Sequence, residues 1–281
     1  NVKRSRPLAR VITVTSGKGG VGKSNTAINL AIQFRKMGKK VVILDADFGL
    51  ANIEIMFGAV PKHNLSDLIY QGKNIKDIIT WGPMEVGFIS GGSGITGLSN
   101  LSKDYLTYIV HNLAELDTIA DVIIVDTGAG ISDAVLEFLV ASGEILLVTT
   151  PEPTSITDSY SLLKALNGHP GLELDNTQIC MIANRVSTAN EGEVLFQKLD
   201  VVVSRYLKLP ITYLGAVPQD PLLAKAVMQQ LPVSLQNPQA RSAQAYEEIA
   251  AKLMKQDEGQ NTQKRGVAAF FSHIIGKRNN G

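Results

Sequence analysis

Short runs of apolar, mostly β-branched residues recur along the chain and are separated by longer amphipathic segments. Seven runs are long enough to form strands, at residues 11–15, 41–44, 86–89, 122–125, 145–149, 179–183 and 211–217. Most of them are apolar at nearly every position, which is typical of parallel strands that helices cover on both faces. The pattern therefore predicts a buried parallel sheet.

The segments between these runs carry helical patterns. After the first run, apolar side chains recur at helical spacing from Ala27 to Met37, and Gly38 follows where a helix commonly ends. Because strand and helix alternate along the chain, we expect an α/β fold with a single doubly wound, mostly parallel β-sheet flanked by helices. In such folds ligands bind beyond the carboxyl ends of the strands.

The composition narrows the class of protein. The chain has 281 residues, of which 44% are hydrophobic, and this suits one large globular domain. The net charge of +1 gives no reason to expect nucleic acid as a partner. The single cysteine, Cys180, excludes an intramolecular disulfide and a multi-cysteine metal site, and its apolar neighbours predict a buried thiol. No apolar run reaches the roughly 18 residues of a membrane span, so we expect a cytoplasmic protein.

A glycine-rich segment follows the first run and opens the first helical pattern. It fits G-x-x-x-x-G-K-[ST], and its residues are Gly17, Lys18, Gly19, Gly20, Val21, Gly22, Lys23 and Ser24. Glycines let consecutive backbone N–H groups point inward, and a helix N-terminus adds positive charge, so the segment predicts a polyphosphate site. In this interpretation Lys23 reaches the β- and γ-phosphates and Ser24 supplies a hydroxyl to Mg²⁺. The alternative is a glycine-rich turn without a ligand.

Three aspartates follow apolar runs. Asp45 and Asp47 come after the second run, and Asp126 comes directly after the fourth. Because the carboxyl ends of parallel strands share one edge of a sheet, we expect these carboxylates beside the phosphate loop. Ser24, Asp45 and Asp126 are the expected holders of Mg²⁺, with Asp126 acting through a water. The alternative is that the aspartates only cap strand ends.

The glycine-rich segment resembles the deviant Walker A motif of the MinD/ParA ATPases, in which a second lysine stands early in the loop, here Lys18. The resemblance implies that the chain binds ATP and Mg²⁺, and Asn25, next to Ser24, is counted with the nucleotide-binding residues. It also implies an ATP-bound homodimer in which Lys18 contacts the nucleotide of the other subunit, so that hydrolysis needs both subunits. Lys18 and Lys23 are then catalytic residues.

The resemblance extends over about residues 10–255. Residues 45–53 resemble the first switch of the family, which makes Asp47 the expected positioner of the attacking water. Residues 126–131 resemble the second switch, whose glycines permit a rearrangement when the γ-phosphate is present. The residues that the resemblance places at the nucleotide base are Asn184, Arg185 and Pro218.

Three local features resemble the flagellar branch of this family, the FlhG/FleN proteins: Asn25 after the Walker serine, the segment 48–53 and the segment 152–158. The resemblance implies a regulator of flagellar number and placement, with an FlhF-like GTPase and flagellar basal-body components as partners. Two alternatives stay open, a MinD-type septum-site ATPase and a ParA-type DNA-partition ATPase. A metal-cluster carrier of the same superfamily is excluded because it needs paired cysteines.

The C-terminal part of the chain departs from the alternation of strands and helices. Residues 256–264 are polar and predict a tether, and residues 265–278 predict an amphipathic helix with basic flanks. The apolar stripe of this helix consists of Val267, Phe270, Phe271, Ile274 and Ile275. It resembles the membrane-targeting tail of MinD, and we expect it to bind an anionic membrane surface. The alternative is a terminal helix that packs on the domain.

These observations divide the chain into four parts. A basic N-terminal segment (1–10) precedes a P-loop ATPase domain (11–255), which the tether joins to the membrane-targeting helix. The expected location is the cytoplasm, with peripheral association at the inner face of the cell membrane.

Overall fold

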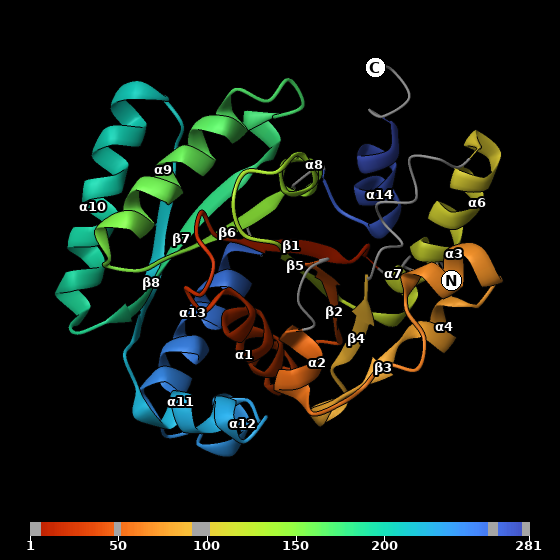
Figure 1. The fold of residues 1–281 in the computed structure, drawn as a ribbon, viewed down its shortest axis with the longest axis horizontal. Coiled ribbons are helices and arrows are strands. Elements are labelled where there is room, and N and C mark those ends of the chain that lie inside the picture. The colour runs from red at the N-terminus through yellow and green to blue at the C-terminus, as the bar shows by residue number, and fades with distance from the viewer. Residues whose placement is uncertain (1–6, 48–51, 92–101, 258–263, 277–281) are drawn as a thin grey trace, which may run out of the picture.

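A mostly parallel sheet with helices on both faces forms the centre of the molecule (Figure 1). The computed structural model describes residues 7–47, 52–91, 102–257 and 264–276. The strands are β1 (Arg10–Thr15), β2 (Val41–Ala46), β3 (Thr80–Trp81), β4 (Gly87–Ser90), β5 (Val122–Thr127), β6 (Glu144–Thr149), β7 (Gln178–Val186) and β8 (Thr212–Pro218). The α-helices are α1 (Lys23–Lys36), α2 (Asn52–Phe57), α3 (Leu65–Gln71), α4 (Ile75–Ile78), α6 (Lys103–Ala114), α7 (Leu116–Ile119), α8 (Asp133–Ala141), α9 (Pro153–Asn167), α10 (Ala189–Tyr206), α11 (Pro221–Met228), α12 (Val233–Gln236), α13 (Arg241–Asp257) and α14 (Val267–Gly276). Short 3₁₀ turns are η1 (Pro83–Glu85) and η3 (Leu174–Asn176).

The strand order is β3-β4-β2-β5-β1-β6-β7-β8. Every neighbouring pair is parallel except β3 and β4. The predicted doubly wound, mostly parallel sheet is confirmed, and all seven predicted strands are present. The apolar pattern does not predict β3, because its two residues are too few to show any periodicity.

Side chains of successive strand residues point to opposite faces, and each face has its own core. Ile124 of β5 packs in the core that contains Phe34 of α1 and Tyr246 of α13. Its neighbours Ile123 and Val125 pack in the opposite core, together with residues of α3, α7, α8 and α14. Helices α9 and α10 cover β6 and β7 on this second face. The strands are therefore buried on both sides, as their continuous apolar runs predict.

β1 begins at Arg10, which the sequence places in the basic N-terminal segment. Its guanidinium binds both carboxylate oxygens of Glu144, each at 2.5 Å, and donates to the carbonyl of Leu253 at 2.9 Å. Arg10 is 3% exposed. This residue is therefore part of the folded domain and not of a solvated segment, because a buried acid on the neighbouring strand β6 compensates its charge.

Helix α14 lies against the domain (Figure 1). The buried side chains of its stripe, each 1–3% exposed, are Val267, Phe270, Phe271 and Ile274. They pack with α8, where the rings of Phe138 and Phe270 have centroids 5.9 Å apart, and α14 also contacts α6. The side chain of Ile275 lies outside the described residues. In this structure the stripe contacts the protein itself, the second of the two arrangements considered; membrane binding stays a prediction.

The segment predicted as a tether is ordered at both ends. Helix α13 continues to Asp257, which forms an ion pair with Arg265. Lys264 donates from Nζ to the carbonyl of Val140 at 3.0 Å. Residues 258–263 lie outside the described residues. No helix in the described parts of the chain is long and apolar enough to cross a membrane.

Candidate functional site

The glycine-rich loop connects β1 to α1 at the carboxyl edge of the sheet, and α1 begins at Lys23. Gly22 caps this helix with a φ of 92°, a left-handed conformation that favours glycine. At Gly17 an added Cβ would overlap the backbone of Asp158 in α9. The loop is therefore held between two helices, with glycine required both by conformation and by space.

Lys23, Ser24 and Asp126 meet at the start of α1. Lys23 Nζ lies 2.7 Å from Asp126 Oδ1, and Ser24 Oγ donates to Asp126 Oδ2 at 2.6 Å. All three side chains are buried, and Asp126 has no exposed surface. The contact forms because β5 lies beside β1, so that the carboxyl end of β5 reaches the loop. The structure thus brings together the expected phosphate-binding lysine and two of the expected metal-holding residues.

Asp45 and Asp47 complete an acidic group at this edge. Asp45 lies opposite Asp126 in the pairing of β2 with β5, and the backbone N–H of Asp47 donates to Asp45 Oδ1 at 3.0 Å. Burial, and after it the repulsion of Asp126, raises the pKa of Asp45 to about 7. Burial also raises the pKa of Asp126, although Lys23 opposes the shift. The positive charge near Asp45 and Asp126 is therefore too small to offset the burial of the two carboxylates.

These observations fit a magnesium-bound triphosphate. Among the described residues, no group of three or more His, Cys, Asp and Glu side chains is arranged to hold a metal ion alone. Mg²⁺ in nucleotide sites commonly takes one or two protein ligands and completes its shell with phosphate oxygens and water. The buried carboxylates Asp45 and Asp126, with the Ser24 hydroxyl beside them, are a suitable oxygen donor set for such a shared site.

Asp47 lines a small cavity beside the segment predicted to be the second switch. The cavity has a volume of about 230 Å³, and its wall includes Gly128, Ala129 and Ser132. A Cβ added at Gly128 would lie 3.6 Å from Asp47 Oδ1, so the Asp47 carboxylate lies close to the backbone of this segment. Residues 48–51 of the predicted first switch lie outside the described residues. The cavity gives Asp47 space for water, which its expected role requires.

Lys18 contacts its own chain. Its Nζ donates to Glu152 Oε2 at 2.7 Å and to Thr154 Oγ1 at 3.0 Å. The hydrogen bond and charge of Lys18 lower the pKa of the Glu152 carboxyl. Glu152 occupies the N-cap position of α9 but makes no side-chain hydrogen bond to that helix. In the sequence it belongs to the segment 152–158, which resembles the flagellar branch. The overlooked signal is the position of this segment directly after an apolar run, because each strand ends at the same edge as the loop.

The residues assigned to the nucleotide base lie at the ends of β7 and β8. Asn184 is 2% exposed and donates from Nδ2 to the carbonyl of Val21 at 2.7 Å, while its Oδ1 has no hydrogen-bond partner among the described residues. Arg185 follows with a φ of 58°, and Pro218 pairs with Val186 at the end of β8. Asn184 therefore adjoins the loop and keeps one buried acceptor for an additional donor. Asn25 lies in the first turn of α1, next to the same loop.

Comparison with known proteins extends these observations. A model of the ParA family, described as "NUBPL iron-transfer P-loop NTPase", matches residues 7–254. The chain is 38% identical over 244 residues to the antiactivator FleN of Pseudomonas aeruginosa, covering 87% of this chain and 86% of that protein. It is 33% identical over 270 residues to the flagellum site-determining protein YlxH of Helicobacter pylori, covering 95% and 90%. Its fold is similar to that of the septum site-determining protein MinD of Pyrococcus horikoshii, solved with Mg-ADP, with a TM-score of 0.69, 23% identity, and coverage of 89% and 98%.

Proposed function

Because the chain belongs to the ParA/MinD family of P-loop NTPases, we propose that it is a Mg²⁺-dependent ATPase whose ATP-bound homodimer controls flagellar number and placement. The observation that carries the ATPase proposal is the buried contact of Lys23 and Ser24 with Asp126 at the start of α1. A nucleotide bound to the loop would place its terminal phosphate groups next to the Lys23 ammonium, the Ser24 hydroxyl and the Asp126 carboxylate.

The chain's own residues have separate tasks in this proposal. Lys23 binds the β- and γ-phosphates, leaving the Asp126 carboxylate available to the metal site with Ser24 and Asp45. The metal ion supplies positive charge that offsets the charge of the phosphate oxygens. Asp47 orients the attacking water from the wall of its cavity. Asn184 and Pro218 contact the base.

Dimerisation requires Lys18 to change its partner. In the single chain it binds Glu152 and Thr154, both of which lie within reach of the loop. In the dimer it leaves them and stabilises the charge on the nucleotide of the second subunit, as an arginine finger does in other phosphoryl-transfer enzymes. Hydrolysis then depends on a second copy of the chain.

The flagellar role rests on the similarity to the flagellum site-determining protein YlxH and to the antiactivator FleN, whose branch of the family the sequence resembles. Both similarities span most of this chain and most of the relative, so they concern the whole domain. The partners in this proposal are an FlhF-like GTPase and components of the flagellar basal body. A MinD-type role in septum placement is the second candidate, because relatives named as septum site-determining protein MinD also match most of the chain. DNA partition receives no support from the net charge of +1.

Iron transfer, which the description of the family model mentions, is not part of the proposal. The chain has one cysteine, Cys180, which is 2% exposed within β7. Burial raises the pKa of this thiol to about 12, so at neutral pH it is not the thiolate that an iron site requires.

Membrane association depends on the release of α14. Its apolar stripe packs on α8, and α8 begins at Asp133, directly after the second switch segment at 126–131. A rearrangement of that segment in the ATP-bound dimer shifts α8 and frees the stripe for anionic lipid. Two released helices in one dimer bind more tightly than one, because the second binds at a high effective concentration. The protein is then cytoplasmic in its monomeric state and peripherally membrane-bound as a dimer.

The proposal is tested by co-sedimentation with vesicles of anionic lipid, comparing ADP with a non-hydrolysable ATP analogue. Sedimentation is expected with the analogue only, and deletion of residues 265–281 is expected to abolish it while dimer formation persists. Equal sedimentation with ADP and with the analogue would contradict the proposal that ATP binding controls membrane association. If the chain without residues 265–281 still sediments with the vesicles, α14 is not the segment that binds the membrane.

A further inference from the structure

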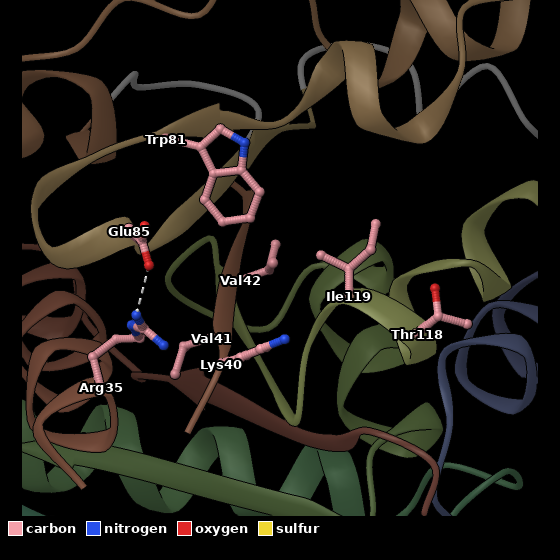
Figure 2. A pocket seen from close by; sticks show the side chains of 8 residues that line it. All are labelled: Arg35, Lys40, Val41, Val42, Trp81, Glu85, Thr118 and Ile119. Atoms are coloured by element: carbon pink, nitrogen blue, oxygen red, sulfur yellow. Dashed lines mark hydrogen bonds and ion pairs between the residues drawn. The ribbon is translucent and has the colours of Figure 1, made fainter. Parts of the chain in front are cut away.

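A second cavity lies at the edge of the sheet opposite the nucleotide loop (Figure 2). Its volume is about 550 Å³, which is within the range of sites for small molecules. Its apolar lining comes from Val41 and Val42 at the start of β2, Trp81 of β3 and Ile119 of α7. These residues lie at the amino ends of the parallel strands, whereas the loop lies at their carboxyl ends. A ligand here does not compete with a nucleotide for space.

Trp81 forms an aromatic wall of this cavity. It is 54% exposed and is the only tryptophan in the chain. It pairs across the strands with Gly87, where an added Cβ would lie 3.2 Å from Trp81 Cζ3 and 2.9 Å from Val42 Cγ2. The missing side chain at Gly87 therefore lets the indole rest on the sheet next to Val42. A large aromatic ring presented this way is an apolar surface for a flat partner.

Lys40 brings a positive charge to the same cavity. Its backbone is fixed, because its N–H donates to Asp121 Oδ2 at 2.7 Å and its carbonyl accepts from the Asp121 N–H at 2.8 Å. Its ammonium group extends toward Ile119 in Figure 2. Within the described residues, no hydrogen bond or ion pair involves Lys40 Nζ. This cation is positioned by the backbone and is available to an anion.

The second cation at the cavity, Arg35, is already occupied. Its Nη2 lies 3.0 Å from Glu85 Oε2, and its Nε donates to the carbonyl of Met84 at 2.8 Å. Met84 and Glu85 have φ values of 54° and 58°, a left-handed conformation that residues other than glycine rarely adopt. Strain of this kind persists where the surroundings fix it, and it concentrates at ligand sites. Arg35 thus keeps the rim in place, and of the two cations that line the cavity Lys40 is the one whose side chain has no ion pair with a described residue.

We propose that this cavity binds a small organic anion with a flat apolar body. The body stacks on the indole of Trp81 and fills the apolar space between Trp81 and Ile119, and the anionic group pairs with Lys40. An inorganic anion gains nothing from the apolar lining, and a neutral ring leaves Lys40 without a partner. The lining therefore selects for both properties in one molecule.

The test uses the fluorescence of Trp81, which reports on this cavity alone because the chain has no other tryptophan. The probe is anilinonaphthalene sulfonate, a flat aromatic anion, and its matched control is phenylnaphthylamine, a similar ring system without the sulfonate. The anionic probe is expected to quench Trp81 emission and to receive its energy. The neutral probe is expected to bind at least about tenfold more weakly, a difference of about 1.4 kcal/mol.

Variants separate this site from general apolar binding. Lys40→Met is expected to weaken the anionic probe about tenfold and to leave the neutral probe unchanged. Lys39→Met removes the neighbouring charge, which does not line the cavity, and is expected to change neither. Both lysines are exposed, so thermal melting should match the wild type. Equal binding of the two probes to the wild type, an absence of Trp81 quenching, or full affinity in Lys40→Met would each overturn the proposal.

Discussion

Lys18 Nζ and Glu152 Oε2 lie 2.7 Å apart within one chain, between the glycine-rich loop and the start of α9. The lysine expected to reach a second subunit thus has an acidic partner of its own. The side chains of Lys18 and Glu152 are 36% and 55% exposed, so water and salt screen their attraction. Such a contact is weak enough to exchange during the proposed dimerisation.

Glu152→Gln is expected to lower the protein concentration at which the ATP-bound dimer forms, because Lys18 no longer has to leave a carboxylate. Sedimentation equilibrium with a non-hydrolysable ATP analogue measures this midpoint. Glu248→Gln, an exposed acid on α13, is the matched control and should leave the midpoint unchanged. A midpoint for Glu152→Gln at or above the wild-type value would show that the contact does not favour the monomer.

Asp47→Ala is expected to reduce steady-state ATP hydrolysis by about 100-fold or more, since it removes the group that orients water. Nucleotide binding should persist, because Lys23 and Asn184 remain. Chromatography after addition of hydrolysable ATP should therefore show a lasting dimer. Wild-type turnover by this variant would mean that another group positions the water.

The nucleotide-free, metal-free protein is expected to lose stability as the pH rises from about 4 to about 7. The pKa of Asp45 is about 7 in the folded state against 3.8 as its ordinary value, so in this window the folded state binds more protons than the unfolded state. The linkage relation then makes the free energy of unfolding fall with rising pH, by about 1.4 kcal/mol for each pH unit at most.

Urea unfolding at several pH values in the presence of a chelator measures this slope, and Asp45→Asn should flatten it. Asp121→Asn, at the opposite edge of the sheet, serves as the comparison. A slope that survives Asp45→Asn would assign the pH dependence to other groups, with Asp126 the first to consider because burial raises its pKa as well.

Phe270→Ala is expected to lower the unfolding free energy of the monomer by about 3 kcal/mol, since it removes a buried ring that packs on Phe138. The same change at an exposed ring, Tyr206→Ala, should cost much less. Chemical denaturation with ADP measures both. An equal, small loss for the two variants would indicate that α14 is not docked in solution.

The position of Asp126 at the same sheet edge as the glycine-rich loop could be predicted from the sequence, because parallel strands end at one edge whatever their order. Its contact with Lys23 and Ser24 also requires β5 to lie beside β1. The partner of Lys18 could not be predicted. Glu152 reaches it because β6 lies beside β1, and strand order depends on the packing of the whole sheet. The edge rule therefore predicts which residues lie at the edge, and the strand order decides which of them are in contact.

The C-terminal stripe shows a second limit of sequence patterns. The spacing of apolar residues identifies one apolar face on α14. Such a face is expected to be buried against a partner. The identity of the partner depends on whether the rest of the domain leaves a matching surface, and α6 and α8 provide one. A pattern along one helix contains no information about that surface.

The buried guanidinium of Arg10 holds together parts of the chain that the ribosome makes far apart in time. Its acid partner Glu144 is translated 134 residues after Arg10, and the carbonyl of Leu253 follows 243 residues after Arg10. Until then the first strand carries a charge whose hydrogen bonds are incomplete. The domain therefore reaches its final packing only after α13 has been made, and nascent chains that stop before α13 should depend on chaperones to stay soluble.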